Sequence, residues 1–173
     1  PSFSESVNTS KTNVSLNSVE QSGSSGNLSF SEVAHGLDDT LTVPEGYRVE
    51  VLIRWGDPIF EGVSAFDPWQ LDAKEQLQRF GFNNDYIGFV PYPFGSESSE
   101  RGLLVVNHEF VSTPLMFPGS PKGMELSREQ VETSIAAHGL SVVEVQRKAG
   151  NWLVDTASSF NRRITPDTPM QFT

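Results

Sequence analysis

The stretch of sequence that decides the fold is Gly102-Leu103-Leu104-Val105-Val106-Asn107-His108-Glu109-Phe110. Its four consecutive β-forming residues predict a strand that is buried on both faces. The strand ends abruptly in an amide, an imidazole and a carboxylate. Such an end holds oxygen and nitrogen donors on a rigid support, where metal ligands and catalytic groups are usually mounted. The simpler alternative is a strand that runs out into a polar turn.

The composition of the 173 residues excludes several classes of function. With 22 acidic and 12 basic residues the net charge is −10, whereas a nucleic-acid groove needs clustered lysine and arginine. An acidic surface is compatible with cation binding, although it more often keeps a protein soluble. There is no cysteine, which excludes disulfides, zinc–thiolate sites and cysteine nucleophiles within this chain. No apolar run approaches membrane-spanning length and no signal peptide is visible, so no membrane contact is predicted.

Residues 1–40 are predicted to form a polar, disordered tail. Serine, asparagine, threonine, glycine and glutamate dominate most of it, so it buries too little apolar surface to offset the entropy of ordering. Order is predicted to begin near Leu41, where Pro44-Glu45-Gly46 makes a turn that leads into a strand. The folded domain is therefore predicted over residues 41–173.

Short strands are predicted along this domain. Apolar and charged residues alternate over Tyr47–Ile53, which predicts a half-buried strand. Further strands are predicted at Tyr86–Val90, Leu103–Val106, Leu140–Val145 and Trp152–Val154, the last two joined by a hairpin turn at Lys148-Ala149-Gly150-Asn151.

Two short helices are predicted to interrupt the strands. Asp67-Pro68 predicts an N-cap followed by proline at the first helical position. The buried stripe of this helix would be Trp69, Ala73, Leu77 and Phe80. Ser127-Arg128-Glu129-Gln130 is a capping box that opens a second helix. Its apolar side would carry Val131, Ile135 and Ala136. The predicted fold class is therefore all-β with short helical insertions.

Seven blocks of the sequence resemble, in the same order, those of PhoX-type alkaline phosphatases. The blocks are Val43-Pro44-Glu45-Gly46-Tyr47, Ile53-Arg54-Trp55-Gly56-Asp57-Pro58, Phe82-Asn83-Asn84-Asp85, Val106-Asn107-His108-Glu109-Phe110, Met116-Phe117-Pro118-Gly119, Ala137-His138-Gly139 and Asn161-Arg162-Arg163-Ile164-Thr165. They extend over roughly Val43–Met170, essentially the whole part that is predicted to be ordered.

The resemblance implies an exported bacterial phosphomonoesterase on a larger six-bladed β-propeller, of which this chain is the N-terminal part. Such an enzyme holds calcium and iron at the propeller's centre and acts on small-molecule phosphate monoesters. It is expected to be a monomer, in the periplasm or secreted, after twin-arginine export. The family's iron site includes a cysteine and its members are several times longer. We therefore expect these residues to hold only part of the metal site and to be inactive alone.

On that resemblance, Glu109 is the first candidate for a metal ligand. Calcium and ferric iron are hard cations that prefer carboxylate and carbonyl oxygen, and a carboxylate partly withdrawn from water needs a counter-charge. Asn107 lies two residues earlier, so in an extended chain it faces the same side as Glu109. Its amide oxygen could bind calcium or hydrogen-bond the neighbouring backbone. His108 faces the other side and is expected to be a hydrogen-bonded packing residue.

Several other polar residues are weaker candidates. Asn84 and Asp85 could support the metal ligands from behind, but both are also ordinary turn formers. His138, at a helix C-terminus, is a helix cap by default and a supporting residue otherwise. Arg162 or Arg163 could contact phosphate through its guanidinium fork. At most one of the two arginines should reach the site, and an ion pair with a carboxylate is the expected partner of either.

Two other functions stay open at this point. The chain could be a non-enzymatic β-propeller scaffold or an extracellular calcium-binding module, whose acidic residues hold structural calcium or solvate the surface. It could also belong to another metal hydrolase, such as a phosphodiesterase or lactonase. Comparing phosphate monoesters with diesters would separate the last alternative from a phosphomonoesterase.

Overall fold

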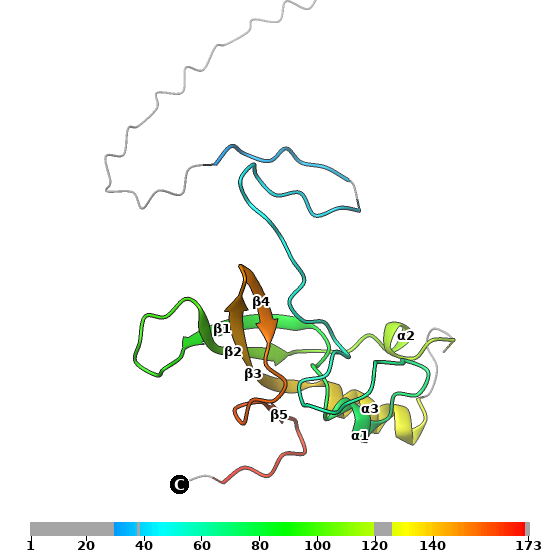
Figure 1. Ribbon diagram of the computed structural model, residues 1–173. Coiled ribbons are helices and arrows are strands. Elements are labelled where there is room, and N and C mark those ends of the chain that lie inside the picture. Colours follow the sequence, from blue (N-terminus) through cyan, green and yellow to red (C-terminus); the bar gives the residue numbers. More distant parts are fainter. Residues whose placement is uncertain (1–29, 38, 120–125, 172–173) are drawn as a thin grey trace, which may run out of the picture. The chain divides into compact units, whose positions relative to one another are not determined.

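The computed structural model describes residues 30–37, 39–119 and 126–171, and its main element is an open antiparallel sheet (Figure 1). The strands are β1 (Asn84–Pro91), β2 (Arg101–His108), β3 (Gly139–Lys148), β4 (Asn151–Val154) and β5 (Arg162–Ile164). The helices are α1 (Ala73–Gln76), α2 (Thr113–Met116) and α3 (Arg128–Ala137). The predicted combination of a sheet with short helical insertions is therefore confirmed.

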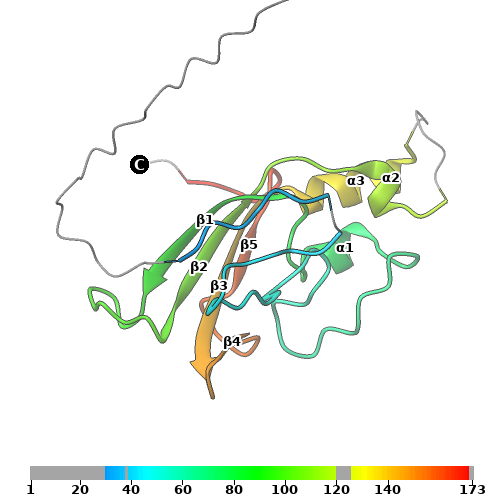
Figure 2. The same cartoon turned by 90° about the horizontal axis from the view of Figure 1, so that it is seen from above.

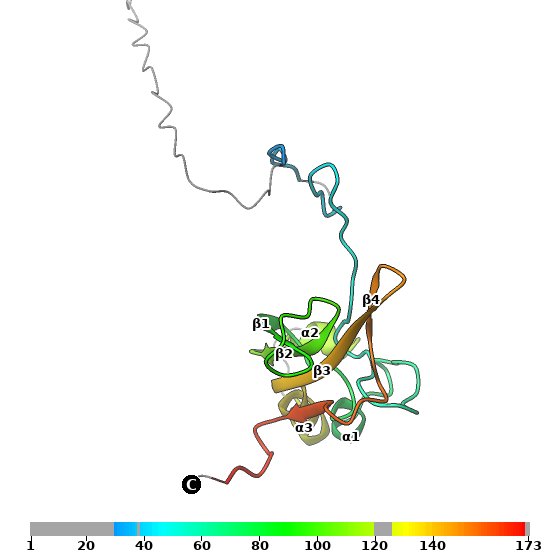
Figure 3. The ribbon, with the colours of Figure 1, turned by 60° about the vertical axis from the view of Figure 1, so that its left-hand side comes forward.

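The sheet is a meander in which β1 pairs with β2, β2 with β3, and β3 with β4. Its order is β1-β2-β3-β4, and β5 also pairs with β3. Strand β3 is long enough to take two partners on one side. Its second half pairs with β4 and its first half with β5, so the two short strands lie one after the other along it (Figures 2 and 3). Strands β2 and β3 thus form the centre of the sheet.

The β3–β4 hairpin confirms the predicted turn. Lys148 pairs with Asn151, which leaves a two-residue connection. Ala149 and Gly150 both have positive φ, 51° and 84°. A two-residue turn whose twist matches that of the flanking strands requires positive φ at both of its residues.

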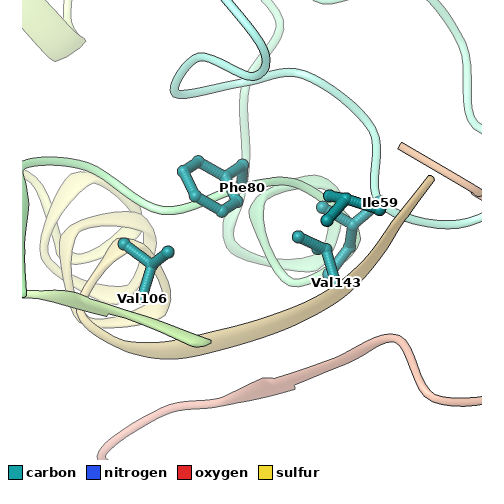
Figure 4. Packing of buried hydrophobic residues seen from close by; sticks show 5 residues of the cluster. Ile59, Phe80, Val106 and Val143 are labelled. Atoms are coloured by element: carbon teal, nitrogen blue, oxygen red, sulfur yellow. The ribbon is translucent and has the colours of Figure 1, made fainter. Parts of the chain in front are cut away.

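One face of the sheet packs against the segments that precede β1. Val106 and Val143 point from β2 and β3 toward Phe80 and Ile59, as Figure 4 shows. All four side chains are at most 1% exposed, and Val145 completes the cluster. The sequence run that predicted a buried strand therefore does supply the core.

Tyr47–Ile53 does not form a strand, so that prediction is wrong. The chain over these residues makes no ladder with any strand in the described part. Val51 is 75% exposed, while Leu52 and Ile53 pack against the core. The alternation of apolar residues identifies an extended segment, but a strand also needs a neighbour for its backbone groups.

The helix predicted from Asp67 is much shorter than expected and begins later. Asp67 accepts a hydrogen bond from the backbone N of Trp69 at 2.9 Å and closes only a turn, which leaves Trp69 73% exposed. Asp72 is the actual N-cap of α1 and accepts from the backbone N of Glu75 at 2.7 Å. The helix ends after four residues, because the backbone around Arg79 pairs with residues 57–59.

Helix α3 begins at the predicted capping box, but its predicted buried side is only partly correct, since Ala136 is buried and Ile135 half-buried whereas Val131 is exposed. The Ser127 hydroxyl accepts from the backbone N of Gln130 at 3.1 Å, and the Gln130 side chain accepts from the backbone N of Ser127 at 3.0 Å. The buried residues are Thr133, Ser134, Ala136 and Ala137. Val131 is 41% exposed. Helix α3 packs against α1 (Figure 3) and buries Thr133 and Ser134 as well as its alanines, so hydrophobicity alone does not identify the whole buried face.

Replacing Ser127 by alanine should lower the free energy of unfolding by about 1 kcal/mol, because two backbone N–H groups of α3 would lose the reciprocal capping arrangement. Urea denaturation measures this loss. Ser127→Asp keeps a capping oxygen and should stay within about 0.5 kcal/mol of the parent. Equal losses in both variants would show that the cap does not stabilise the fold.

The described residues before Glu50 belong to a unit separate from the one that begins at Glu50. The predicted Pro44-Glu45-Gly46 turn is present, since Tyr47 N donates to Pro44 O at 3.1 Å and Gly46 has a φ of 86°. The rings of Phe30 and Tyr47 meet edge to face at 5.6 Å. Most of the tail predicted over residues 1–40 lies outside the described residues, and its described part contains no helix or strand. No helix in the described ranges has the length and apolar character needed to cross a membrane.

Candidate functional site

Strand pairing brings the predicted site residues to one end of the sheet. His108, the last residue of β2, pairs with Asn84 at the start of β1 and with Gly139 at the start of β3. We call Asn107, His108 and Glu109 the rim. The other candidates on the strands and loops at this end are Asn84, Asp85, His138, Arg162 and Arg163. The register thereby gathers residues that are up to 79 positions apart in the sequence, as Asn84 and Arg163 are.

Asn107 is held by the neighbouring strand. Its amide oxygen accepts a hydrogen bond from the backbone N of Tyr86 at 2.5 Å. The β1–β2 register is irregular between Asn84 and Ile87, so this part of β1 departs from regular ladder pairing. The sequence left two roles open for the Asn107 amide oxygen, calcium binding and a hydrogen bond to the neighbouring backbone. The structure shows the hydrogen bond.

His108 is a buried, hydrogen-bonded residue, as predicted. It is 3% exposed, and its Nε2 lies 2.7 Å from the hydroxyl of Ser141. Its ring meets Phe80 edge to face with 4.9 Å between the centroids. A Cβ atom at Gly81 would overlap the imidazole, so Gly81 must be glycine for the ring to lie there.

Arg163 joins this buried group from β5. One terminal nitrogen donates to the Ser141 hydroxyl at 2.9 Å. The other donates to the carbonyls of Ala136 and His138, both at 2.8 Å. These carbonyls belong to the C-terminal end of α3, where a cation is favoured. Arg163 therefore ties β5 to the end of α3.

Burial sets the charge state of these groups. It lowers the pKa of His108 from 6.5 to about 3, and the positive charges of Arg163 and His138 act in the same direction. Burial also lowers the pKa of Arg163, to about 10. At neutral pH the imidazole of His108 is therefore uncharged and the guanidinium of Arg163 is charged.

The lowered pKa of His108 predicts that stability falls as the pH falls from 7 to 5. Below pH 6.5 the unfolded chain binds a proton at this imidazole that the folded chain does not. Each pH unit below 6.5 should therefore remove roughly 1.4 kcal/mol of unfolding free energy, until the pH approaches 3. Urea denaturation at several pH values measures the slope. His108→Gln cannot titrate, and an unchanged slope in that variant would contradict the assignment.

The Glu109 carboxylate is exposed, so the expectation that it is partly withdrawn from water is wrong. The chain leaves the sheet after His108 and carries Glu109 outward. Its backbone N donates to the carbonyl of Asn83 at 3.2 Å, while its carboxylate has no hydrogen bond or ion pair within the described residues. Glu109 therefore combines a fixed backbone with an available side chain.

The buried carboxylate of the sheet is Glu144, which the sequence analysis did not single out. It is 2% exposed and accepts hydrogen bonds from Arg101 Nε and from the Ser158 hydroxyl, the latter at 2.5 Å. Burial raises the pKa of Glu144, but these hydrogen bonds and the charge of Arg101 outweigh burial and lower it overall. Since both carboxylate oxygens accept hydrogen bonds from within the fold, Glu144 has a structural role. A carboxylate within the apolar run of β3 was the signal that could have indicated it.

His138 is the C-terminal cap of α3, which was its default role. Its backbone N donates to the carbonyl of Ile135 at 3.2 Å, and its Nδ1 lies 2.7 Å from the carbonyl oxygen of Ser134. Asn84 and Asp85 begin β1 with exposed side chains. These three residues therefore lie at the same end of the sheet as Glu109, and none of them belongs to a cluster of acidic or imidazole side chains in the described part.

The expected ion pairs of Arg162 and Arg163 are not formed in the described part of the chain. Arg163 binds helix carbonyls instead, because these lie beside it at the end of α3. Arg162 is exposed, and its Nε donates to the carbonyl of Phe160 at 3.2 Å. The two arginines differ as predicted for neighbours on a strand, and only Arg162 keeps its terminal nitrogens available.

The donor chemistry at this end fits a hard cation only in part. Carboxylate oxygen is what calcium and ferric iron prefer, and Glu109 offers one on a fixed backbone. Nowhere in residues 30–37, 39–119 and 126–171 do three histidine, aspartate or glutamate side chains come together to hold a metal. The described residues thus supply one fitting ligand and do not complete a metal centre.

Comparison with known proteins places the chain in a family of phosphatases. The sequence matches the family described as "Alkaline phosphatase PhoX" over residues 28–173. The chain therefore belongs to the PhoX family of alkaline phosphatases.

A solved structure supports the assignment. The chain is similar to Pseudomonas fluorescens PhoX in complex with vanadate, a transition state analogue, at 36% sequence identity and a TM-score of 0.70. The match covers 79% of this chain and 23% of that one, so the chain spans about a quarter of the length of that protein. No curated protein matches the chain.

Proposed function

We propose that this chain is the N-terminal part of a phosphatase that hydrolyses small-molecule phosphate monoesters and releases inorganic phosphate. The observation that carries the proposal is the 36% identity to a PhoX protein whose structure contains vanadate, a transition state analogue. The family match over residues 28–173 supports it. A non-enzymatic scaffold or a calcium-binding module explains neither match.

The whole protein is proposed to be a metal-dependent enzyme that uses calcium and iron. Hydrolysis of a phosphate monoester requires neutralisation of the non-bridging oxygens, an aligned nucleophile and a stabilised leaving alkoxide. Bound cations supply this electrostatic stabilisation. Within this chain we assign Glu109 as a metal ligand because its carboxylate is exposed and unpartnered on a fixed backbone. A ligand role for Asn107 remains a weaker proposal, since its amide oxygen already accepts from Tyr86 N.

The other polar residues receive supporting roles in this proposal. Arg162 is the better candidate for a phosphate contact, because Arg163 uses both terminal nitrogens to hold Ser141 and the end of α3. His138 supports the site indirectly by ending α3 directly before β3. Asn84 and Asp85 remain candidates through their position at the start of β1.

The architecture of the whole protein and its location belong to the same proposal. The antiparallel meander of β1 to β4 suits one blade of a β-propeller, which typically contains four strands. We propose a six-bladed propeller, a monomer, and export by the twin-arginine route to the periplasm or the medium. This chain alone is then expected to be inactive.

The complete reading frame, purified and supplied with calcium and iron, tests the function. We expect it to hydrolyse p-nitrophenyl phosphate at alkaline pH at least 100-fold faster than bis(p-nitrophenyl) phosphate. Chelation should abolish the activity, and the two metals together should restore it. A folded, metal-loaded protein without activity would favour the scaffold. A preference for the diester would indicate another metal hydrolase.

A further inference from the structure

We infer that Ser141 is a positioning residue of the proposed metal site, which holds the rim in place through His108 so that Glu109 meets its cation. This inference rests on the proposed function. Ser141 touches neither Glu109 nor a substrate group; its hydroxyl joins His108 of β2 to Arg163 of β5. It is 0% exposed, so its role must be exerted through these contacts.

The direction of the hydrogen bonds can be assigned from the donors available. Arg163 can only donate, so the Ser141 oxygen accepts from it. If the Ser141 hydroxyl then donates to Nε2 of His108, its own proton is satisfied. In the reverse direction the buried hydroxyl proton and the second imidazole nitrogen, Nδ1, would both lack a partner in the described residues, whereas in the first direction only Nδ1 lacks one. The hydrogen bonds therefore run from Arg163 through Ser141 to His108.

This chain of hydrogen bonds anchors the rim to the rest of the fold. Its origin, Arg163, is fixed by the carbonyls of Ala136 and His138 at the end of α3. Its other end is the imidazole of His108, the residue directly before Glu109. Three segments, β5, β3 and α3, thereby restrain the last residue of β2.

Each of the three rim residues is restrained, but only one carboxylate is left available. Asn107 is bonded to Tyr86, His108 to Ser141, and the backbone of Glu109 to Asn83. Restraint of the backbone around an unpartnered carboxylate is what metal ligands require from the residues behind them.

Ser134 provides a matched control for this inference. It is also a buried serine, 7% exposed, and lies nearby on α3. Its hydroxyl has no hydrogen-bond partner within the described residues. Ser134→Ala and Ser141→Ala therefore make the same chemical change in buried surroundings, and only Ser141→Ala breaks the link to His108.

Calcium binding to the metal-free complete protein tests the inference, with calcium alone as the titrant in calorimetry. Ser141→Ala should weaken the calcium Kd by 10- to 100-fold, the usual effect of removing a partner behind a metal ligand. Ser134→Ala should stay within twofold of the parent. Thermal unfolding of the metal-free variants separates a loss of affinity from a loss of fold. If Ser141→Ala does not fold, Arg163→Lys breaks the same link while keeping the charge, and it should weaken calcium binding in the same direction.

Glu109→Gln, titrated in parallel, separates the possible failures. Suppose that Glu109→Gln weakens calcium binding, while Ser141→Ala (or Arg163→Lys, if Ser141→Ala does not fold) stays within twofold of the parent. Ser141 then has no positioning role. If Glu109→Gln itself binds calcium like the parent, the ligand assignment fails and the inference fails with it. Neither result alters the hydrolysis of p-nitrophenyl phosphate by the parent, which tests the proposed function separately.

Discussion

Replacing Glu109 by glutamine should lower the phosphatase activity of the complete protein by about 100-fold or more, which corresponds to roughly 2.7 kcal/mol of transition-state stabilisation. The amide keeps the size of the side chain but removes the negative charge that a hard cation prefers. Because the Glu109 side chain is exposed and unpartnered in the described part of the chain, the substitution should leave the fold intact. Hydrolysis of p-nitrophenyl phosphate, with bound metal quantified by mass spectrometry, measures both effects.

Glu61→Gln is the matched control for this prediction. Glu61 is also an exposed glutamate in the same compact unit, but it lies in a turn and in none of the strands. Its loss of charge should change neither activity nor metal content. Equal activity in the parent and in Glu109→Gln would show that the metal site lies elsewhere, although the family assignment would stand.

Replacing Phe80 by alanine should lower the free energy of unfolding by about 3–5 kcal/mol, the usual range for a fully buried phenylalanine. Phe80 is 1% exposed, packs in the central cluster under β2 and β3, and touches the ring of His108. Its removal leaves a cavity directly behind the rim. Urea denaturation measures the loss of stability, and calcium titration of the folded fraction should show weaker binding as well.

Leu153→Ala makes a comparable truncation at the edge of the same sheet. Leu153 lies on β4 and is 47% exposed, so its removal should cost less than about 1 kcal/mol. Similar losses at Phe80 and Leu153 would contradict the location of the core. A large loss at Phe80 without any change in calcium affinity would show that the packing behind His108 does not influence the rim.

Strands with strong local signals could be predicted from the sequence. Strand β2 follows from its run of β-formers, and the β3–β4 hairpin follows from the Ala149-Gly150 turn. Tyr47–Ile53 has an equally regular alternation but pairs with no strand among the described residues. Periodicity reports which side chains face the same way. It does not report whether a neighbouring strand is present to pair with the backbone.

The start of a helix is hard to predict where two possible N-cap residues lie close together in the sequence. Asp67 and Asp72 are both good capping residues, and the sequence alone favoured the one followed by proline. In the structure Asp72 begins the helix while Asp67 closes only a turn, and pairing of residues 57–59 with residues 78–80 ends the helix after four residues. Helix α3 was located correctly from its capping box, since both capping hydrogen bonds are local.

The position of the site could be predicted, but its hydrogen bonds could not. The residues at the end of β2 were identified because polar donors followed a buried strand. The partners of His108 and Arg163 come from β3 and α3, and only the register shows that Ser141 lies between them. Ser141 itself had no signal, because a serine within an apolar strand is as often a simple packing residue.

The most direct test of the proposed role of the rim is anomalous X-ray diffraction from crystals of the complete protein grown with calcium and iron. The account predicts a metal peak at roughly 2.0–2.6 Å from a carboxylate oxygen of Glu109, with the Ser141–His108 hydrogen bond in place. Metal peaks that are bound entirely by other residues, with the Glu109 carboxylate in solvent, would contradict it.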